Sequence, residues 1–260
     1  MTNTDFGSLT TLDVNQLPDH SIAVQPIGAV EQHGAHLPLI TDALIARCVA
    51  EQAAARSTAP AYVLPTVFYG KSTEHLGFAG TIALSTETLI ALCRDVGRSL
   101  AQSGLTKLLF VNGHGGQPHL LEMVSRDIRA DTGMQVFVVT PMRFGAPPDV
   151  VLGDAEWGIH GGELETSVML ALAPELVRMD QARPGGLAAR DLFDRSRRLT
   201  LEGVVPTAWI TDDLSVTGVI GDPTPATQAT GVRIAEHWVN GLTEAIDDIG
   251  AFRFPARDRS

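Results

Sequence analysis

The sequence predicts an α/β protein, a single domain with a mainly parallel β-sheet covered by helices on both faces. Short segments rich in Val, Ile and Leu alternate along the chain with longer segments of helical pattern. Such alternation favours parallel strands joined by crossover helices, which bury both faces of the sheet. Because 44% of the 260 residues are hydrophobic and the composition shows no sharp break, we expect one domain over residues 1–260.

Four strands and five helices are expected. The strands are short segments rich in β-branched and other apolar residues, at 21–27, 62–68, 108–111 and 135–140. The helices are longer segments with helical spacing, at 41–56, 85–103, 119–132, 165–173 and 228–248. In the second helix Ser85 or Thr86 suits the N-cap, and Gly104 suits the C-terminal stop. Ligands of such a sheet bind beyond the carboxyl ends of its strands.

The most informative segment is GAVEQHGAHLPLITD, residues 28–42, where acidic and imidazole side chains gather in an otherwise apolar stretch. The candidate metal ligands are Glu31, His33, His36 and Asp42, because carboxylate oxygens and imidazole nitrogens suit zinc, manganese or iron. In an extended segment Glu31 and His33 would point to the same side of the chain. The alternative is that the histidines are hydrogen-bonding groups in a tight Gly-Pro loop.

A second candidate is KLLFVNGHGGQPH, residues 107–119, in which a buried strand ends at a glycine-rich turn around His114. Glycines on both sides of His114 remove side-chain bulk, so an ion or a ligand can approach the imidazole closely. Glycine-rich turns between a strand and a helix also bind phosphates. This turn has neither the dinucleotide-binding nor the P-loop pattern, which disfavours the phosphate interpretation.

The third segment is EWGIHGGELETSVMLAL, residues 156–172, where His160, Glu163 and Glu165 precede a long apolar helical stretch. A carboxylate at this place can simply complement the positive end of the helix, and we favour that interpretation for Glu163. Glu165 lies five residues after His160, across a Gly-Gly turn. We interpret Glu165 as a functional residue.

Several of these segments follow predicted strand ends, namely Glu31, the turn at residues 69–75 and His114. Because the carboxyl ends of parallel strands lie at one edge of a sheet, we expect these noncontiguous residues to converge there. Weaker candidates for substrate contacts, each more often structural when judged alone, are Ser72, Glu74, His75 and Trp157.

With these motifs the chain resembles the creatininase (creatinine amidohydrolase) family, whose members hydrolyse carbon-nitrogen bonds with the help of metal ions. The matching segments are E-x-H-G-x-H-L-P from Glu31 with Asp42 after it, HLGFAGT at 75–81, NGHGG at 112–116, HGGELETSVMLAL at 160–172 and GVIGDPTPAT at 218–227. They span nearly the whole chain in family order. The resemblance therefore implies one creatininase-like metal-dependent hydrolase domain.

The resemblance also implies a pair of divalent ions per chain, with zinc, manganese or iron as the candidates. The implied ligands are Glu31, His33, Asp42 and His114, with Asp42 bridging. Glu165 is a further metal candidate beside the second ion, and His36 would support the ligands. A metal-activated hydroxide would attack a cyclic amide or formamide, and His160 would protonate the departing nitrogen, a role that its near-neutral ordinary pKa allows.

Two departures limit the choice of substrate. Creatininase has a tyrosine and a metal-binding glutamate directly after the histidine that His114 matches, where this chain has Gly115 and Gly116. The NGHGG form is instead similar to members that act on formamides of pyrimidine nucleotide precursors, and to the peptidase-like member of mycofactocin maturation. Creatininase also has a tryptophan four residues before the histidine matching His160, whereas Trp157 lies three before it. Creatinine is therefore not expected to be the best substrate.

Other functions stay open on the sequence alone. A metal-activated hydroxide can also attack a ketone, which would make the chain a ring-opening hydrolase acting on a carbon-carbon bond of a cyclic ketone. A peptidase-like activity within the same family is a second alternative. A non-catalytic metal-binding protein is disfavoured, because His160 and all four implied ligand positions are retained.

Charge and composition argue against two classes of partner, whereas the resemblance implies a small-molecule substrate and further copies of the chain as partners. The net charge of −11 argues against nucleic acid and anionic membranes. The absence of a signal-like N-terminus and of a run of about 18 apolar residues favours a cytoplasmic protein. Cys48 and Cys93 are interpreted as buried thiols. The resemblance implies a homo-oligomer, commonly a hexamer, with Trp209 and the irregular, partly basic residues 182–206 as candidate contacts and a solvated charged face as the alternative.

Overall fold

The computed structural model describes residues 4–255 and centres on a four-stranded parallel sheet in the order β2-β1-β3-β4. The strands are β1 (Ile22–Ile27), β2 (Ala61–Val63), β3 (Lys107–Asn112) and β4 (Gln135–Val139). Residue Ile22 pairs with both Ala61 and Lys107, so the strands begin together and their carboxyl ends share one edge. The predicted α/β class is confirmed, whereas the predicted domain limits, residues 1 and 260, lie outside the described residues.

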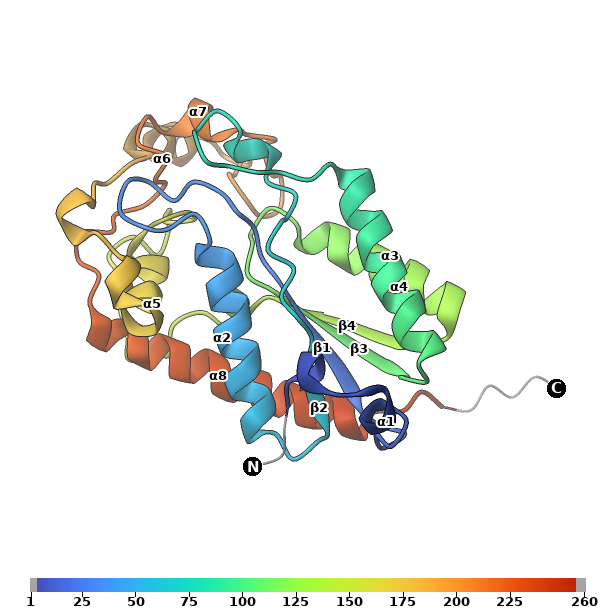
Figure 1. Cartoon of the computed structure of the whole chain (residues 1–260). Coiled ribbons are helices and arrows are strands. Elements are labelled where there is room, and N and C mark those ends of the chain that lie inside the picture. The colour runs from blue at the N-terminus through green and yellow to red at the C-terminus, as the bar shows by residue number, and fades with distance from the viewer. Residues whose placement is uncertain (1–3, 256–260) are drawn as a thin grey trace.

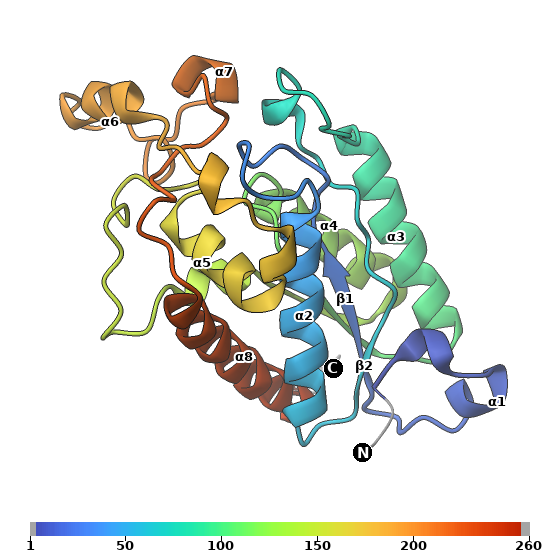
Figure 2. The same cartoon turned by 60° about the vertical axis from the view of Figure 1, so that its left-hand side comes forward.

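Two layers of helices enclose the sheet (Figures 1 and 2). One face carries α2 (Thr41–Arg56), α5 (Glu163–Leu172) and α8 (Gln228–Ala251), and the other carries α3 (Thr86–Gln102) and α4 (Pro118–Thr132). Side chains that alternate along each strand explain the two layers. Val24 and Leu109 pack with Trp238 in one core, whereas Ala23 and Phe110 belong to the other core.

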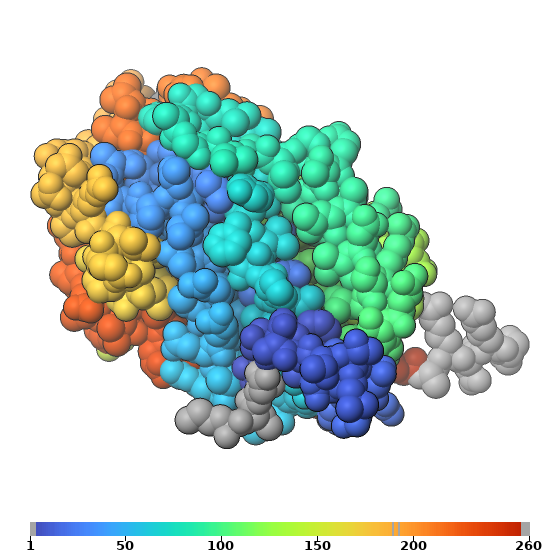
Figure 3. All heavy atoms as spheres, in the orientation of Figure 1, coloured from blue at the N-terminus to red at the C-terminus, as the bar shows by residue number. Residues whose placement is uncertain are grey.

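Shorter elements lie outside these layers. The short α-helices are α1 (Thr11–Val14), α6 (Leu187–Asp194) and α7 (Thr211–Leu214). The 3-10 turns are Phe6–Ser8, Thr73–His75, Pro141–Phe144, Pro174–Leu176 and Met179–Gln181. The α7 helix contacts the turn at Thr73–His75, and the two segments lie side by side at the end of the molecule in Figure 3. No helix in the described part of the chain combines the length and apolar character needed to cross a membrane.

Two local expectations were wrong. The strand predicted at 62–68 ends at Val63, because Pro26 faces this edge of β1 without an N–H to donate. Beyond Val63, the N–H groups of Leu64 and Val67 donate to the carbonyls of Val24 and Pro26. An advance of three residues after β2 thus matches an advance of two residues in β1, and regular pairing is lost. The segment 182–206, expected to be irregular, contains α6.

The contact between α5 and α8 is close enough to predict a large cost for one added methyl group. A Cβ atom at Gly231 would lie 1.7 Å from the Ser167 carbonyl oxygen. Gly231→Ala is therefore expected to lower the free energy of unfolding by about 2 to 3 kcal/mol, although alanine is the better helix former. Chemical denaturation checks this.

The matched control is Gly241→Ala on the same helix. Its added Cβ would meet the Phe144 ring at 3.1 Å, and a side chain can shift where a carbonyl in the neighbouring helix cannot. We expect the control to change stability by less than about 1 kcal/mol. A Gly231→Ala protein as stable as wild type would show that α5 and α8 can separate freely.

Candidate active site

The first turn of α2 and the loop after β3 meet at the carboxyl edge of the sheet. A Cβ at Gly113 would lie 2.1 Å from the Asp42 carbonyl oxygen, so only glycine allows this approach. The Asn112 side chain holds the turn, because its Nδ2 donates to the His114 carbonyl at 2.7 Å and its Oδ1 accepts from the His114 N–H at 3.2 Å. As a result, His114 Nδ1 lies 3.2 Å from Asp42 Oδ2.

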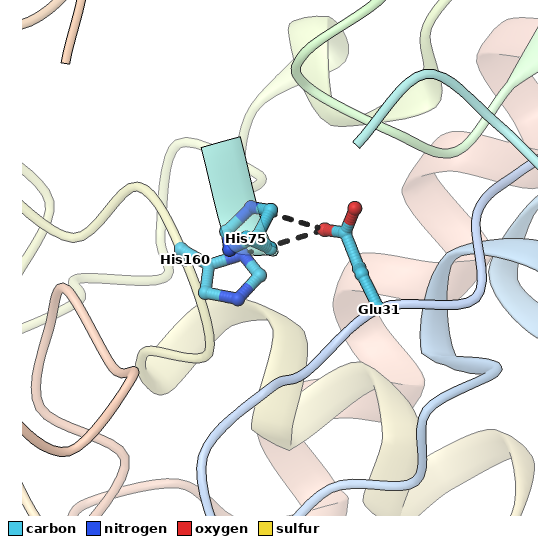
Figure 4. A group of neighbouring side chains, drawn as sticks. All are labelled: Glu31, His75 and His160. Carbon is cyan, nitrogen blue, oxygen red and sulfur yellow. Dashed lines mark ion pairs between the residues drawn. The ribbon is translucent and has the colours of Figure 1, made fainter. Parts of the chain in front are cut away.

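Glu31 is completely buried and lies among three imidazoles. Its Oε1 is 3.4 Å from His75 Nε2 and 3.7 Å from His160 Nδ1, as Figure 4 shows, and its Oε2 is 3.1 Å from His114 Nδ1. These residues come from four separate loops: the one after β1, the turn at Thr73–His75, the one after β3 and the one before α5.

Glu31 and the three imidazoles adjoin a second group of side chains, and the two groups together are called the cluster here. His33 lies at the centre of the second group. Its Nε2 lies 3.0 Å from Asp42 Oδ1 and 4.0 Å from Glu165 Oε1. Its ring centroid lies 4.3 Å from that of His160. Residues 31–33 do not form a regular strand. The side chains of Glu31 and His33 nevertheless lie close together, with 3.9 Å between Glu31 Oε1 and His33 Nε2.

The cluster offers three groups of ligand atoms, each group close enough to hold one cation. They are Glu31 with Asp42 and His114, His33 with His160 and Glu165, and Glu31 with His75 and His160. Both carboxylate oxygens of Glu31 and Oδ2 of Asp42 are buried without a hydrogen-bond partner among the described residues. Burying such oxygens uncompensated is costly, and a divalent ion with oxygen and nitrogen ligands would compensate them. The residues therefore fit a metal centre.

The ionisation of the cluster reflects its crowded charges. Burial disfavours a charged imidazole, but the carboxylates of Asp42, Glu165 and Glu31 outweigh it and raise the pKa of His33 to about 10. Burial also raises the pKa of Glu165 to about 7, aided by the negative charges of Asp42 and Glu31. The cluster thus requires positive charge, which protons or divalent cations can supply.

His160 has a defined tautomer. Its Nε2 lies 2.7 Å from the Gln32 carbonyl oxygen, which can only accept, and 3.1 Å from Gln32 Nε2, which can only donate. The shorter contact, to the carbonyl, places the hydrogen on His160 Nε2. In the neutral ring Nδ1 is then a free acceptor that faces Glu31. Burial, together with the positive charges of His33 and His75, holds the pKa of His160 well below its ordinary value.

The structure brings six of the predicted site residues together and places others differently. The six are Glu31, His33, Asp42, His114, His160 and Glu165. His75, predicted as a substrate contact, lies inside the cluster. His36 contacts Thr166 Oγ1 at 2.9 Å, at the start of α5, as a supporting residue would. Ser72 lies behind His114, with its Oγ 3.5 Å from Nε2.

Trp157 lies outside the cavity that the cluster lines. Its ring packs against Arg190, with 5.7 Å between the guanidinium carbon and the ring centroid, and it lines a neighbouring groove of 700 Å³. The aromatic wall at the cluster is instead Trp209, whose ring lies 6.3 Å from that of His75. The predicted contact between Trp157 and a small substrate at the cluster does not fit this placement.

Sequence reasoning also missed Gln32, which lies between two predicted ligands in the first motif. Its Nε2 is 3.0 Å from His75 Nδ1 and donates to the Gly218 carbonyl at 2.9 Å. An amide is not a typical metal ligand, so nothing in the motif singled Gln32 out. For Trp209 the only available signal was its aromatic character, because no motif adjoins it.

The cluster borders two cavities that share lining residues with a neighbouring groove. A cavity of 40 Å³ contacts Glu31 and His114, and an adjoining one of 360 Å³ shares His160 and Glu165 with it. Both share Ile159 with the 700 Å³ groove. The hollow beside the cluster is therefore larger than a small flat ring requires.

Comparison with known proteins agrees with this architecture. The family model described as Creatininase, creatinine amidohydrolase, matches residues 7–246. The mycofactocin precursor peptide peptidase of Mycolicibacterium smegmatis is 38% identical over 225 residues, which cover 85% of this chain and 82% of that protein. The creatinine amidohydrolase of Pseudomonas putida is 30% identical over 246 residues, covering 86% of this chain and 88% of that protein.

Solved structures extend the likeness to the fold. Two creatininase structures, described as "Creatininase Mn" and as a mutant of "Zn-Zn type", are each 26% identical and cover 95% of this chain and 98% of theirs. Their TM-scores are 0.75 and 0.76. The resemblance noted in the motifs therefore extends over 95% of the chain.

Proposed function

The chain belongs to the creatininase family of hydrolases, and from this premise we propose that it is a metal-dependent amidohydrolase that cleaves an amide carbon-nitrogen bond in a peptide-derived substrate. The observation that carries the proposal is the buried cluster whose carboxylate oxygens on Glu31 and Asp42 have no hydrogen-bond partner among the described residues. Among the bonds that the sequence left open, the relatives named as peptide peptidases favour a peptide bond over a formamide or a cyclic amide.

We assign the ligands by the atoms that face one another. Glu31, Asp42 and His114 would hold one divalent ion through Glu31 Oε2, Asp42 Oδ2 and His114 Nδ1. His33 and Glu165 would hold a second, with Asp42 between the two because its other oxygen faces His33 at 3.0 Å. Bound ions of this kind polarise an amide carbonyl and lower the pKa of water toward neutrality.

His160 is the group that we assign to proton transfer. Because its Nε2 hydrogen is held by the Gln32 carbonyl, a proton from the attacking water would be taken up at Nδ1, the atom that faces the cluster. The low pKa of the buried ring then favours giving that proton up again, to the departing nitrogen. His160 Nδ1 would therefore first accept the proton of the water and then donate it to the departing nitrogen, and the second of these is the role expected from the sequence.

The surrounding residues orient and shield this histidine. The His160 ring is stacked on that of His75 with centroids 4.1 Å apart. Gln32 and Thr211 hold His75 Nδ1, at 3.0 and 2.8 Å. Trp209 and Ile159 line the cavity at the cluster and provide apolar walls there.

Creatinine is expected to be a poor substrate. Gly115 and Gly116 stand where creatininase has a tyrosine and a glutamate, and Trp157 lies outside the cavity. Losing a polar or stacking contact weakens transition-state binding by about 1 to 3 kcal/mol. The loss of the tyrosine and tryptophan contacts alone therefore predicts a kcat/KM on creatinine roughly 100-fold or more below that on the best short peptide.

The measurement is a screen of short peptides, creatinine, formamidopyrimidines and cyclic ketones with the protein loaded with Mn, Zn or Fe(II). Cleavage of a peptide amide supports the proposal. Turnover of a cyclic ketone alone would replace it with the carbon-carbon hydrolase, and creatinine as the best substrate would show that the two glycines do not exclude it.

We also propose that the chain forms a homo-oligomer through the end of the molecule that carries α6 and α7. Val204 and Val216 are 95% and 97% exposed there, and Leu199 is 53% exposed. These exposed apolar side chains are the groups that association of this end of the molecule would remove from solvent. Light scattering should report a multiple of 27.7 kDa, and a monomer mass at all working concentrations would rule the oligomer out.

A further inference from the structure

The loop at Lys71–Glu74 encloses the outer nitrogen of His114, the atom that points away from the cluster. His114 Nε2 lies 3.0 Å from the Lys71 carbonyl oxygen, 3.3 Å from Glu74 Oε1 and 3.5 Å from Ser72 Oγ. A carbonyl can only accept a hydrogen bond, so Nε2 carries the hydrogen. In the neutral ring, the form that can bind a cation, the lone pair of Nδ1 is then left for the cluster, where Nδ1 faces Glu31 Oε2 at 3.1 Å.

Glu74 is the acidic member of this loop and is itself held in place. Its side chain is 10% exposed, and its Oε2 accepts from Lys71 Nζ at 2.9 Å. Its backbone carbonyl accepts from Thr211 Oγ1 at 2.9 Å, which ties the loop to α7. The carboxylate therefore has one oxygen on Lys71 and the other directed at His114.

The space that the Glu74 carboxylate occupies exists because residue 116 is glycine. A Cβ built at Gly116 would lie 1.8 Å from Glu74 Oε1 and 2.6 Å from His114 Nε2. Any side chain at 116 would displace the Glu74 carboxylate. The position of the Glu74 carboxylate therefore depends on a glycine that lies 42 positions later in the sequence.

We propose that Glu74 is the positioning residue of the metal centre, which holds His114 in its ion-binding tautomer from a place that Gly116 leaves free. The inference rests on the proposed metal-dependent function. A carboxylate on the outer N–H of a ligating histidine orients the ring and makes the inner nitrogen a better donor to a cation. Where creatininase has a metal-binding glutamate at the position of Gly116, this chain places a carboxylate from a different loop beside His114 Nε2.

The test measures zinc affinity of the metal-depleted full chain by competition with a chelating indicator. Glu74→Ala is expected to weaken the zinc site formed by Glu31, Asp42 and His114 by about 10- to 100-fold, the usual cost of removing the outer partner of a ligating histidine. Gly116→Ala is expected to weaken the same site in the wild-type background and to have a smaller effect in the Glu74→Ala background, since the displaced carboxylate is already gone.

The matched control is Glu163→Ala, which removes a buried carboxylate near the cluster that accepts from the Gly153 N–H at 2.6 Å and does not contact His114. Its zinc affinity should equal that of wild type, and thermal melting of each variant separates altered binding from unfolding. Nitrogen-15 NMR of labelled histidines gives a second measure. The hydrogen should lie on His114 Nε2 in the zinc-loaded wild type, and the Nε2 and Nδ1 resonances of His114 should shift in zinc-loaded Glu74→Ala, where only the Lys71 carbonyl still accepts from Nε2.

The outcomes separate this inference from the proposed function. If folded wild-type protein binds no zinc, manganese or iron, the metal-dependent function fails. If wild type binds zinc and folded Glu74→Ala binds it equally well with the same His114 resonances, only the role of Glu74 is refuted. An equal loss of affinity in Glu163→Ala would also refute that role, because the effect would then follow from any buried carboxylate.

Discussion

Replacing Asp42 by alanine is expected to remove both divalent ions from the purified protein and to abolish most of its turnover. Asp42 is the residue whose two oxygens face two different imidazoles, His33 at 3.0 Å and His114 at 3.2 Å. Bound ions contribute several kcal/mol of transition-state stabilisation and each 1.4 kcal/mol is tenfold in rate, so kcat should fall roughly 1000-fold or more. Elemental analysis should find close to two ions per wild-type chain and none in the variant.

The control for this change is Glu51→Ala, an exposed carboxylate on the same helix, which should keep its metal and its activity. Asp42→Asn preserves the size of the side chain and removes its charge, so it should reproduce the loss of metal without a cavity. Circular dichroism verifies that both variants fold. A folded Asp42→Ala protein with its full complement of ions would contradict the bridging assignment.

Replacing His160 by alanine is expected to lower turnover by roughly 100-fold or more, the usual contribution of a well-placed proton-transfer group. The Nδ1 atom of His160 faces Glu31 at 3.7 Å, and its Nε2 hydrogen is committed to the Gln32 carbonyl. The variant should keep its metal content, because the ligand assignment does not depend on this ring. Added imidazole should restore part of the activity, since the cavity left by the side chain can admit it.

His20→Ala is the matched control, since this histidine is exposed and lies at the opposite edge of the sheet, before β1. Its kcat should be unchanged. Two results would contradict the assignment of His160. A wild-type rate in His160→Ala would remove the proton-transfer role. The loss of one ion together with the activity would show that His160 is a metal ligand, since it belongs to two of the three ligand groups.

Much of the architecture could be predicted because it depends on local pattern. The helix predicted at 41–56 has the observed limits Thr41–Arg56, and the strand predicted at 135–140 is observed at Gln135–Val139. Apolar periodicity and end signals are properties of neighbouring residues, so they survive folding unchanged. The strand predicted at 62–68 failed because its pairing depended on Pro26, a residue of another strand.

The gathering of Glu31, the turn at 69–75 and His114 was also predictable, since each follows a predicted strand end at one edge of the sheet. The identity of the other contacts was not. His75 belongs to the cluster rather than to its rim, and Trp209 rather than Trp157 forms the aromatic wall. The place of His75 depends on the path of the connection between β2 and α3, and that of Trp209 on the long connection between α5 and α8. No periodicity in either segment encodes its path.

The sequence by itself therefore determined the α/β class, the edge of the sheet where the acidic and imidazole side chains meet, and the family resemblance, because motifs at strand ends and apolar spacing are local. Only the tertiary structure decided which atoms of those side chains face one another, and that Glu74 fills the space left at Gly116. The physical reason is that a metal centre depends on contacts within a few ångströms between loops far apart in the chain. Such contacts exist only after the helices and strands have packed.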